Sequence, residues 1–241
     1  MGIVRVAAAQ MKVTEDIDKN LNKILNFIDK AASKKAKIVC FPEVCLDCDE
    51  SKRININPYI RKIQEKCKNK RIYCVVGSYV KESKKIFNSV FLIDNKGKIK
   101  YEYRKMHLWR DEKKRVTPGR RNRVIDTDFG KIAVIDCWDI AFSQLVKKLS
   151  GEGAKIIFCP VFEVDYSGDW RVTPQIPQVR AYENMVYFVI CDAFSPRTLS
   201  QSGIFSPLKI LAKIRKKEGI IFADLDMKKL AKWRRYYDCW K

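Results

Sequence analysis

The beginning of the chain alternates a short apolar run, an amphipathic stretch and a second apolar run, and this order limits the possible folds most. Residues 3–9 and 37–41 are short and apolar enough to be buried strands. In residues 16–33, apolar side chains recur at steps of three and four, the spacing of a helix that packs on one face. Thr14 is a candidate N-cap of this helix, since its hydroxyl can accept a backbone N–H. Strand, helix and strand in this order predict a parallel crossover unit.

A second unit of this kind is expected over residues 131–160, with strands at 131–136 and 155–160 and a helix at 140–149. Between the two units, Asn95-Lys96-Gly97 separates two apolar runs and predicts a hairpin turn. Because no linker rich in Pro, Gly or Ser divides the chain, we expect a single domain over residues 1–241, with two packed sheets and outer helices. The remaining predicted elements are helices at 58–70, 174–185 and 227–233, and strands at 72–78, 86–94, 98–103, 186–192, 203–206, 208–214 and 220–224.

The chain is strongly basic, with 49 Lys and Arg against 28 Asp and Glu and a formal net charge of +21. The basic residues are interrupted by apolar ones at helix or strand spacing and form no unbroken tail, which favours a solvated surface. The alternative is binding to nucleic acid or to an anionic membrane surface. No apolar run approaches the length that spans a bilayer, so we expect no membrane partner.

The nine cysteines are an odd number, and several lie inside apolar runs, where they are expected to pack as small hydrophobic residues. Arg5 interrupts the N-terminal apolar run, so no secretory signal is indicated. Both features predict a cytoplasmic protein with reduced thiols. Cys45-Leu46-Asp47-Cys48 has the spacing of some metal and redox motifs, but no second pair follows at zinc-ribbon spacing. We therefore expect no metal.

Three residues carry the chemistry that the sequence indicates: Glu43, Lys105 and Cys137. Glu43 follows the strand predicted at 37–41, and Cys137 follows the one predicted at 131–136. Ligands bind at the carboxyl ends of strands in open α/β sheets. A carboxylate, an amine and a thiol brought together there form a base, a cationic stabiliser and a nucleophile. Taken singly, each residue also has a plainer explanation, as core cysteine, capping or loop acid, and surface cation.

Short motifs with a specific order and spacing extend over nearly the whole chain. They are Val6-Ala7-Ala8-Ala9-Gln10, Phe41-Pro42-Glu43, Tyr103-Arg104-Lys105-Met106-His107-Leu108, Glu112, Thr117-Pro118-Gly119, the segment around Cys137, Gly153-Ala154-Lys155-Ile156-Ile157, Arg180-Ala181-Tyr182-Glu183-Asn184 and Gly203-Ile204-Phe205-Ser206-Pro207. In this order the chain resembles the nitrilase, or carbon–nitrogen hydrolase, superfamily, and its amidase-like branch in particular. The resemblance implies an α/β fold, a four-layer α-β-β-α sandwich of two mixed sheets with helices on the outer faces.

The resemblance also implies hydrolysis of a non-peptide C–N bond in a small amide or carbamoyl compound. Glu43 is then the general base, Lys105 the cationic stabiliser, Cys137 the nucleophile and Glu112 a second glutamate of the site. A free thiol is only a few per cent thiolate at neutral pH, so a neighbouring carboxylate that accepts its proton assists attack. Attack on an amide releases ammonia or an amine and leaves a thioester, which water hydrolyses. This chemistry needs no metal or organic cofactor.

Substrate-binding residues are expected at Trp138, Phe162 and Trp170, and the backbone N–H of Trp138 is a candidate oxyanion donor. By the resemblance, Phe162 and Trp170 stand where family members often line the pocket; the alternative for either is a place in the core or at an interface. The segment 138–144 lacks the Arg, Pro and Glu of many amidase-like members, and Cys137-Trp138 followed by an acid resembles the nitrilase branch. A nitrile-cleaving enzyme is therefore one alternative. The other is a basic nucleic-acid-binding protein with a degenerate site, although we expect no nucleic acid as partner. Members of the superfamily usually assemble, so a homodimer or higher homo-oligomer is expected.

Two further features are expected to support the structure. By the resemblance, His107 is a supporting residue of the lysine segment and is not part of the triad of Glu43, Lys105 and Cys137. We expect its ring to hydrogen-bond locally. Arg180 and Glu183 are three residues apart on one predicted helix, a spacing that favours an ion pair or an interface contact over chemistry.

Overall fold

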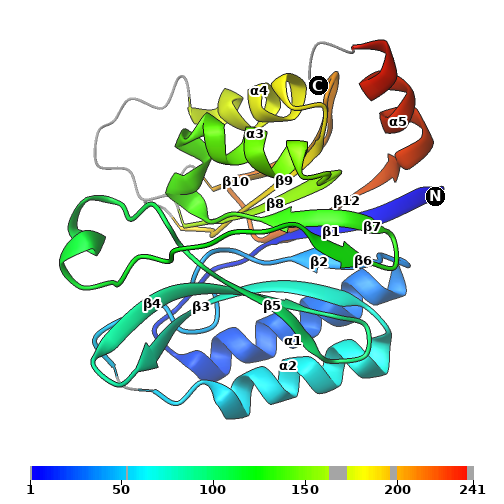
Figure 1. The fold of residues 1–241 in the computed structure, drawn as a ribbon. Coiled ribbons are helices and arrows are strands. Elements are labelled where there is room, and N and C mark those ends of the chain that lie inside the picture. Colours follow the sequence, from blue (N-terminus) through cyan, green and yellow to red (C-terminus); the bar gives the residue numbers. More distant parts are fainter. Residues whose placement is uncertain (1, 53, 163–172, 196–199, 238–241) are drawn as a thin grey trace.

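Two six-stranded sheets lie face to face, with helices on their outer sides (Figure 1). The computed structural model describes residues 2–52, 54–162, 173–195 and 200–237. The predicted α-β-β-α sandwich of two mixed sheets is confirmed. Among the described residues, no helix is long and apolar enough to cross a membrane.

The first sheet contains the amino-terminal strands and the last strand of the chain. Its order is β12-β1-β2-β3-β4-β5, with β1, β2 and β3 parallel and the other pairs antiparallel. Helices α1 and α2 cover its outer face (Figure 1). The elements are β1 (Ile3–Gln10), α1 (Ile17–Ser33), β2 (Ile38–Cys40), α2 (Asn57–Lys70), β3 (Tyr73–Glu82), β4 (Lys85–Ile93), β5 (Ile99–Arg104) and β12 (Gly219–Asp226).

The second sheet has the order β11-β10-β9-β8-β7-β6, with β7, β8 and β9 parallel. Helices α3 and α4 cover its outer face, and α5 lies beside the N-terminus (Figure 1). The elements are β6 (Ile125–Thr127), β7 (Gly130–Val134), α3 (Ser143–Gly151), β8 (Ile156–Val161), α4 (Ile176–Glu183), β9 (Tyr187–Asp192), β10 (Gln201–Ser206), β11 (Lys209–Arg215) and α5 (Met227–Tyr236). The described residues also form the 3₁₀ helices η1 (Arg110–Lys114), η2 (Cys137–Ala141) and η3 (Thr173–Gln175).

Helix α1 begins as its sequence predicts, but its N-cap differs from the expected one. The cap is Asp16, whose carboxylate accepts a hydrogen bond from the backbone N–H of Lys19 at 3.1 Å. Thr14 is not the cap, because its hydroxyl lies 3.1 Å from the side-chain oxygen of Asn20. Asn20 is itself buried, accepts the backbone N–H of Thr14 at 2.9 Å and donates to the Thr14 carbonyl at 2.6 Å, so it fixes the residues before the helix rather than the helix end.

The side chains of β7 alternate between two hydrophobic clusters. Ile132 and Val134 belong to the core between the sheets, whereas Ala133 and Ile135 belong to the core under α3 and α4. Because successive side chains in an extended segment point to opposite faces, the next position on the inner side is Asp136. This residue is fully buried, with an exposed fraction of 0%.

The helix predicted over residues 140–149 is shorter and starts later than expected. The chain first forms η2 and then begins α3 at Ser143, with Phe142 between them in a non-helical conformation. The physical reason is Asp139, whose carboxylate accepts the backbone N–H of Asp136 at 3.0 Å and closes a tight turn. The short strand β6 was absent from the prediction, because three residues carry too little pattern to detect.

Candidate active site

Glu43 lies just beyond β2 and is almost completely buried. Its Oε1 accepts hydrogen bonds from Lys105 Nζ and Asn88 Nδ2, both at 2.7 Å, and its Oε2 accepts one from the backbone N–H of Phe162 at 2.9 Å. The next residue, Val44, has φ of +42°, a conformation that a β-branched residue rarely adopts. The turn after β2 thus holds the Glu43 carboxylate in place at a local conformational cost.

Lys105 follows β5 and is buried with its ammonium between two carboxylates. Its Nζ lies 2.7 Å from Glu43 Oε1 and 2.9 Å from Glu112 Oε2. Burial opposes the charged form, but the charges of Glu43 and Cys137 and of further acids nearby outweigh it and raise the pKa of Lys105 well above its ordinary value. Lys105 is therefore a fixed ammonium, because its pKa is too high for it to act as a base near neutral pH.

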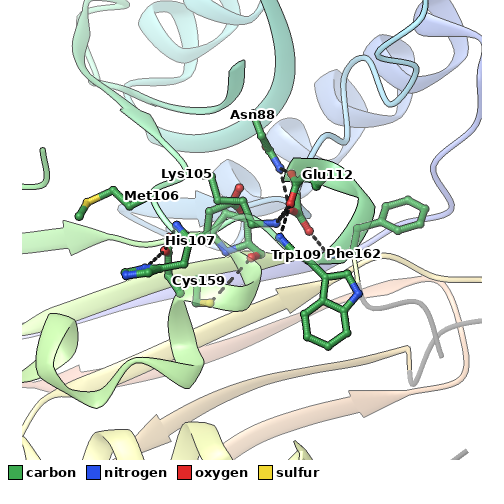
Figure 2. Close-up of polar contacts among 12 residues, drawn as sticks. Asn88, Lys105, Met106, His107, Trp109, Glu112, Cys159 and Phe162 are labelled. Carbon is green, nitrogen blue, oxygen red and sulfur yellow. Dashed lines mark hydrogen bonds and ion pairs between the residues drawn. The ribbon is translucent and has the colours of Figure 1, made fainter. Parts of the chain in front are cut away.

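Glu112 comes from η1 and joins the same cluster. Its Oε2 also accepts the backbone N–H of Trp109 at 2.9 Å, and its Oε1 accepts Asn88 Nδ2 at 2.9 Å. Figure 2 shows Asn88 and Lys105 converging on Glu112, with the Trp109 and Phe162 side chains nearby. The structure thus brings the predicted residues Glu43, Lys105 and Glu112 into direct contact.

Cys137 is the first residue of η2, after the carboxyl end of β7, and has φ of +42°. Few residues other than glycine adopt this conformation, and such strain is common where a reactive side chain must project. Loss of water around the thiol, then the charge of Glu43, raises the pKa of Cys137, and Lys105 partly opposes this rise. A hydrogen bond with Glu43 contributes as well. The thiol is therefore protonated at rest and lies beside a carboxylate that can take its proton.

Asp139 ties the lysine segment to the cysteine turn from a fully buried position. Its Oδ2 accepts the hydroxyl of Tyr103 at 2.5 Å and the backbone N–H of Asp136 at 3.0 Å. Its Oδ1 accepts the backbone N–H of His107 at 3.1 Å and lies 2.7 Å from His107 Nδ1. The His107 ring stacks on Phe142 at 3.6 Å between centroids. His107 thus contacts the segment after Cys137, 32 residues away, rather than bonding locally within the lysine segment as expected.

Aromatic residues adjoin Cys137 and Glu43. Trp138 is 37% exposed and meets Trp109 edge-on at 4.1 Å between centroids. Phe162, at the end of β8, contributes its backbone N–H to Glu43. Trp170 lies outside the described residues. Two of the three predicted substrate-binding residues thus lie next to the group formed by Glu43, Lys105 and Glu112. Trp138 follows Cys137 in the chain, and Phe162 donates its backbone N–H to Glu43.

Asn88 and Asp139 are polar groups of the site that sequence reasoning missed. Asn88 donates to both glutamates, and Asp139 accepts from both segments that carry Lys105 and Cys137. The available signal for Asn88 was a polar residue inside the apolar run that forms β4. Asp139, on η2, was noted only as the acid that follows Cys137-Trp138, and nothing in the local sequence reveals its partners.

Within the part of the chain that the structure describes, no group of three or more His, Cys, Asp or Glu side chains is placed to hold a metal ion. The thiols of Cys45 and Cys48 point to separate carbonyls, those of Gly77 and Thr14. Arg180 and Glu183 form the expected ion pair at 2.9 Å.

Comparison with solved structures defines the fold class first. The amidase from Nesterenkonia sp. superposes with a TM-score of 0.86 at 19% identity, covering 97% of this chain and 96% of that one. Nit3 of Saccharomyces cerevisiae, a member of branch 10 of the nitrilase superfamily, gives a TM-score of 0.87 at 23% identity over 98% of this chain and 94% of that one. The sandwich is therefore the nitrilase fold.

The sequence then defines the family. The carbon-nitrogen hydrolase family model matches residues 5–235, and the chain belongs to this family. The probable hydrolase YhcX of Bacillus subtilis is 31% identical over 230 residues, which are 85% of this chain but 44% of that protein. The omega-amidase NIT2 of Homo sapiens is 26% identical over 257 residues, covering 96% of this chain and 91% of that protein. The predicted membership of the nitrilase superfamily is confirmed.

Proposed function

We propose that this protein hydrolyses a non-peptide C–N bond in a small amide or carbamoyl compound, through a thioester on Cys137. The observation that carries the proposal is the cluster at the strand ends. There, one buried ammonium contacts Glu43 and Glu112 beside a thiol held in a strained turn. Family membership and the resemblance to amidases support the same chemistry.

In the first half-reaction, the Cys137 sulfur attacks the carbonyl carbon while Glu43 accepts the thiol proton. The Lys105 ammonium stabilises the oxyanion that develops, and a preorganised donor of this kind contributes about 3 kcal/mol. Glu43 then gives its proton to the departing nitrogen, and ammonia or an amine leaves. Because the thiol is neutral at rest, proton transfer accompanies the attack.

In the second half-reaction, water attacks the thioester carbon and Glu43 accepts one of its protons. The tetrahedral intermediate collapses to the free acid, and the proton returns to the sulfur of Cys137. Glu112 is assigned the role of holding Lys105 and Asn88 in position, since it contacts both. The Trp138 side chain and Phe162 are assigned to the wall against which the acyl group packs.

The test is intact-protein mass spectrometry after incubation with a panel of small amides, carbamoyl compounds and nitriles, with ammonia assayed in parallel. An acyl-sized mass gain is expected in the wild type and absent in Cys137→Ala. Cys48→Ala is the matched control, because Cys48 is also partly exposed, but its thiol donates a hydrogen bond to the carbonyl of Thr14, away from Glu43 and Lys105. An adduct that persists in Cys137→Ala, or ammonia release at the wild-type rate in that variant, would refute the mechanism.

Panel members also separate the alternatives. Conversion of a nitrile to acid and ammonia without free amide would favour the nitrile-cleaving enzyme. Absence of turnover, together with salt-dependent binding of nucleic acid, would favour the basic binding protein. A homo-oligomer and a cytoplasmic location remain predictions from the sequence.

A further inference from the structure

The carboxyl group of Asp136 is the buried group near the triad whose presence the mechanism does not explain. Asp136 directly precedes Cys137 and is completely buried. Among the described residues, neither of its side-chain oxygens has a hydrogen-bond partner. An unpaired polar group in such a place destabilises the fold by about 1–3 kcal/mol, and more when it is charged. Such a carboxyl group is either protonated or retained for a function.

The surroundings of Asp136 are already rich in negative charge. The ammonium of Lys105 is shared by two carboxylates, and Asp139 on the following turn is a third acid. Among the described residues, Lys105 is the cation whose charge lowers the pKa of Asp136. The titratable groups that face it are Glu43 and Cys45 after β2, Tyr103 and Lys105 at the end of β5, Glu112 on η1, Cys137 and Asp139 on η2, and Cys159 on β8.

In this setting the charged form of Asp136 is disfavoured. Burial, then the charge of Glu43, raises the pKa of Asp136 well above its ordinary value, and Lys105 opposes the rise without cancelling it. While Asp136 is neutral, the charges that act on it are those of Glu43, Glu112, Asp139 and Lys105. Once Asp136 loses its proton, a new negative charge stands one residue from the sulfur, where it opposes both the thiolate and the oxyanion.

We propose that Asp136 is a positioning residue that sets the charge of the site: its neutral carboxyl permits attack by Cys137, and its ionisation in alkaline solution stops turnover. The effect on catalysis rests on the proposed function. The effect on the thiol does not, because it concerns only the charge beside Cys137.

The first test compares Asp136→Asn with the wild type in the pH dependence of kcat/KM for an amide that is turned over. Asparagine has nearly the same shape and cannot ionise. The wild type is expected to lose activity about tenfold per pH unit on the alkaline side, whereas Asp136→Asn keeps its neutral-pH activity to higher pH. Asp126→Asn, at an exposed position on β6 of the same sheet, is the matched control and should retain the wild-type profile. The proposal is overturned if the alkaline limbs of Asp136→Asn and wild type coincide.

The second test needs no substrate. The rate of Cys137 alkylation by iodoacetamide is followed against pH by mass spectrometry, which reports the thiolate fraction. Asp136→Asn is expected to react about tenfold faster than wild type at a pH where Asp136 is ionised, since coupled acids oppose each other's ionisation. Asp136→Leu gives the same comparison if the asparagine variant does not fold. Identical alkylation profiles would overturn the proposal, while a changed profile without amide turnover would leave it standing and remove only the proposed function.

Discussion

Replacing Asp139 removes the acceptor that joins the lysine segment to the cysteine turn. In Asp139→Ala, the hydroxyl of Tyr103 and the backbone N–H of Asp136 lose partners at 2.5 and 3.0 Å, and both residues are fully buried. His107 loses two contacts as well, but it is partly exposed and water can replace them. At about 1–3 kcal/mol for each of the two buried donors left without a partner, the expected loss of unfolding free energy is about 2–6 kcal/mol.

This loss is smaller than most of the 5–15 kcal/mol range that typically stabilises a domain, so the variant should fold at low temperature. Asp139→Asn keeps one acceptor oxygen and loses the charge, and we expect a loss of about 1–3 kcal/mol. Because the Lys105 and Cys137 segments are no longer held together, kcat/KM should fall about hundredfold in Asp139→Ala, as expected for a displacement of about 1 Å.

Urea unfolding followed by circular dichroism measures the stability change, and initial rates on the best amide of the panel measure the second effect. Asp126→Asn is the control for loss of a carboxylate at an exposed site. A stability loss below about 1 kcal/mol in Asp139→Ala would refute the hydrogen-bond reasoning. A large stability loss with unchanged kcat/KM in the folded fraction would refute the positioning role.

Two further predictions concern the Glu43 turn and Asp136. In Gly77→Ala, the new Cβ would lie 2.6 Å from the backbone nitrogen of Val44, so the Glu43 turn must move. Urea unfolding should show a stability loss of about 1–3 kcal/mol, and kcat/KM should fall. In the control variant Gly151→Ala, the new Cβ has nothing within 4 Å, and neither quantity should change. For Asp136→Asn, the folded wild type keeps a proton that the unfolded chain releases above about pH 4, so wild-type stability falls as pH rises. Relative to wild type, the variant should therefore gain about 1.4 kcal/mol per pH unit until Asp136 ionises in the folded state; a pH-independent difference in urea unfolding would contradict this.

Most of the sandwich was predictable because its strands and helices carry strong periodic patterns. The apolar spacing in residues 16–33 predicted α1 to within one residue. Its cap was wrong because Thr14 and Asp16 are both good acceptors, and the choice depends on the buried side chain of Asn20, which the local sequence does not reveal. The late start of α3 depends in the same way on Asp139, whose partners include Tyr103 on another strand.

The candidate site divides along the same line. Glu43 and Cys137 were found because each follows an apolar strand, and Lys105 and Glu112 because their motifs resemble those of a family. The contacts of Lys105 with Glu43 and Glu112 join residues from separate elements of the fold, and no local sequence pattern encodes them. Asp136 was not predicted as a site residue because it is the last residue of the strand predicted at 131–136. Only the structure shows that its carboxyl group is buried without a hydrogen-bond partner.

The register of the first sheet has a consequence for the synthesis of the chain. β1 lies between β2 and β12, and Ile3 is opposite Asp226. On the ribosome, β1 therefore emerges long before one of its two neighbours exists, and its backbone on that side has no strand to bond to. Sheet pairings of such long sequence separation form slowly, and an unpaired apolar strand edge is a template for aggregation. A nascent chain released before residue 219 would thus expose the edge of a largely apolar strand, which is a state that chaperones recognise.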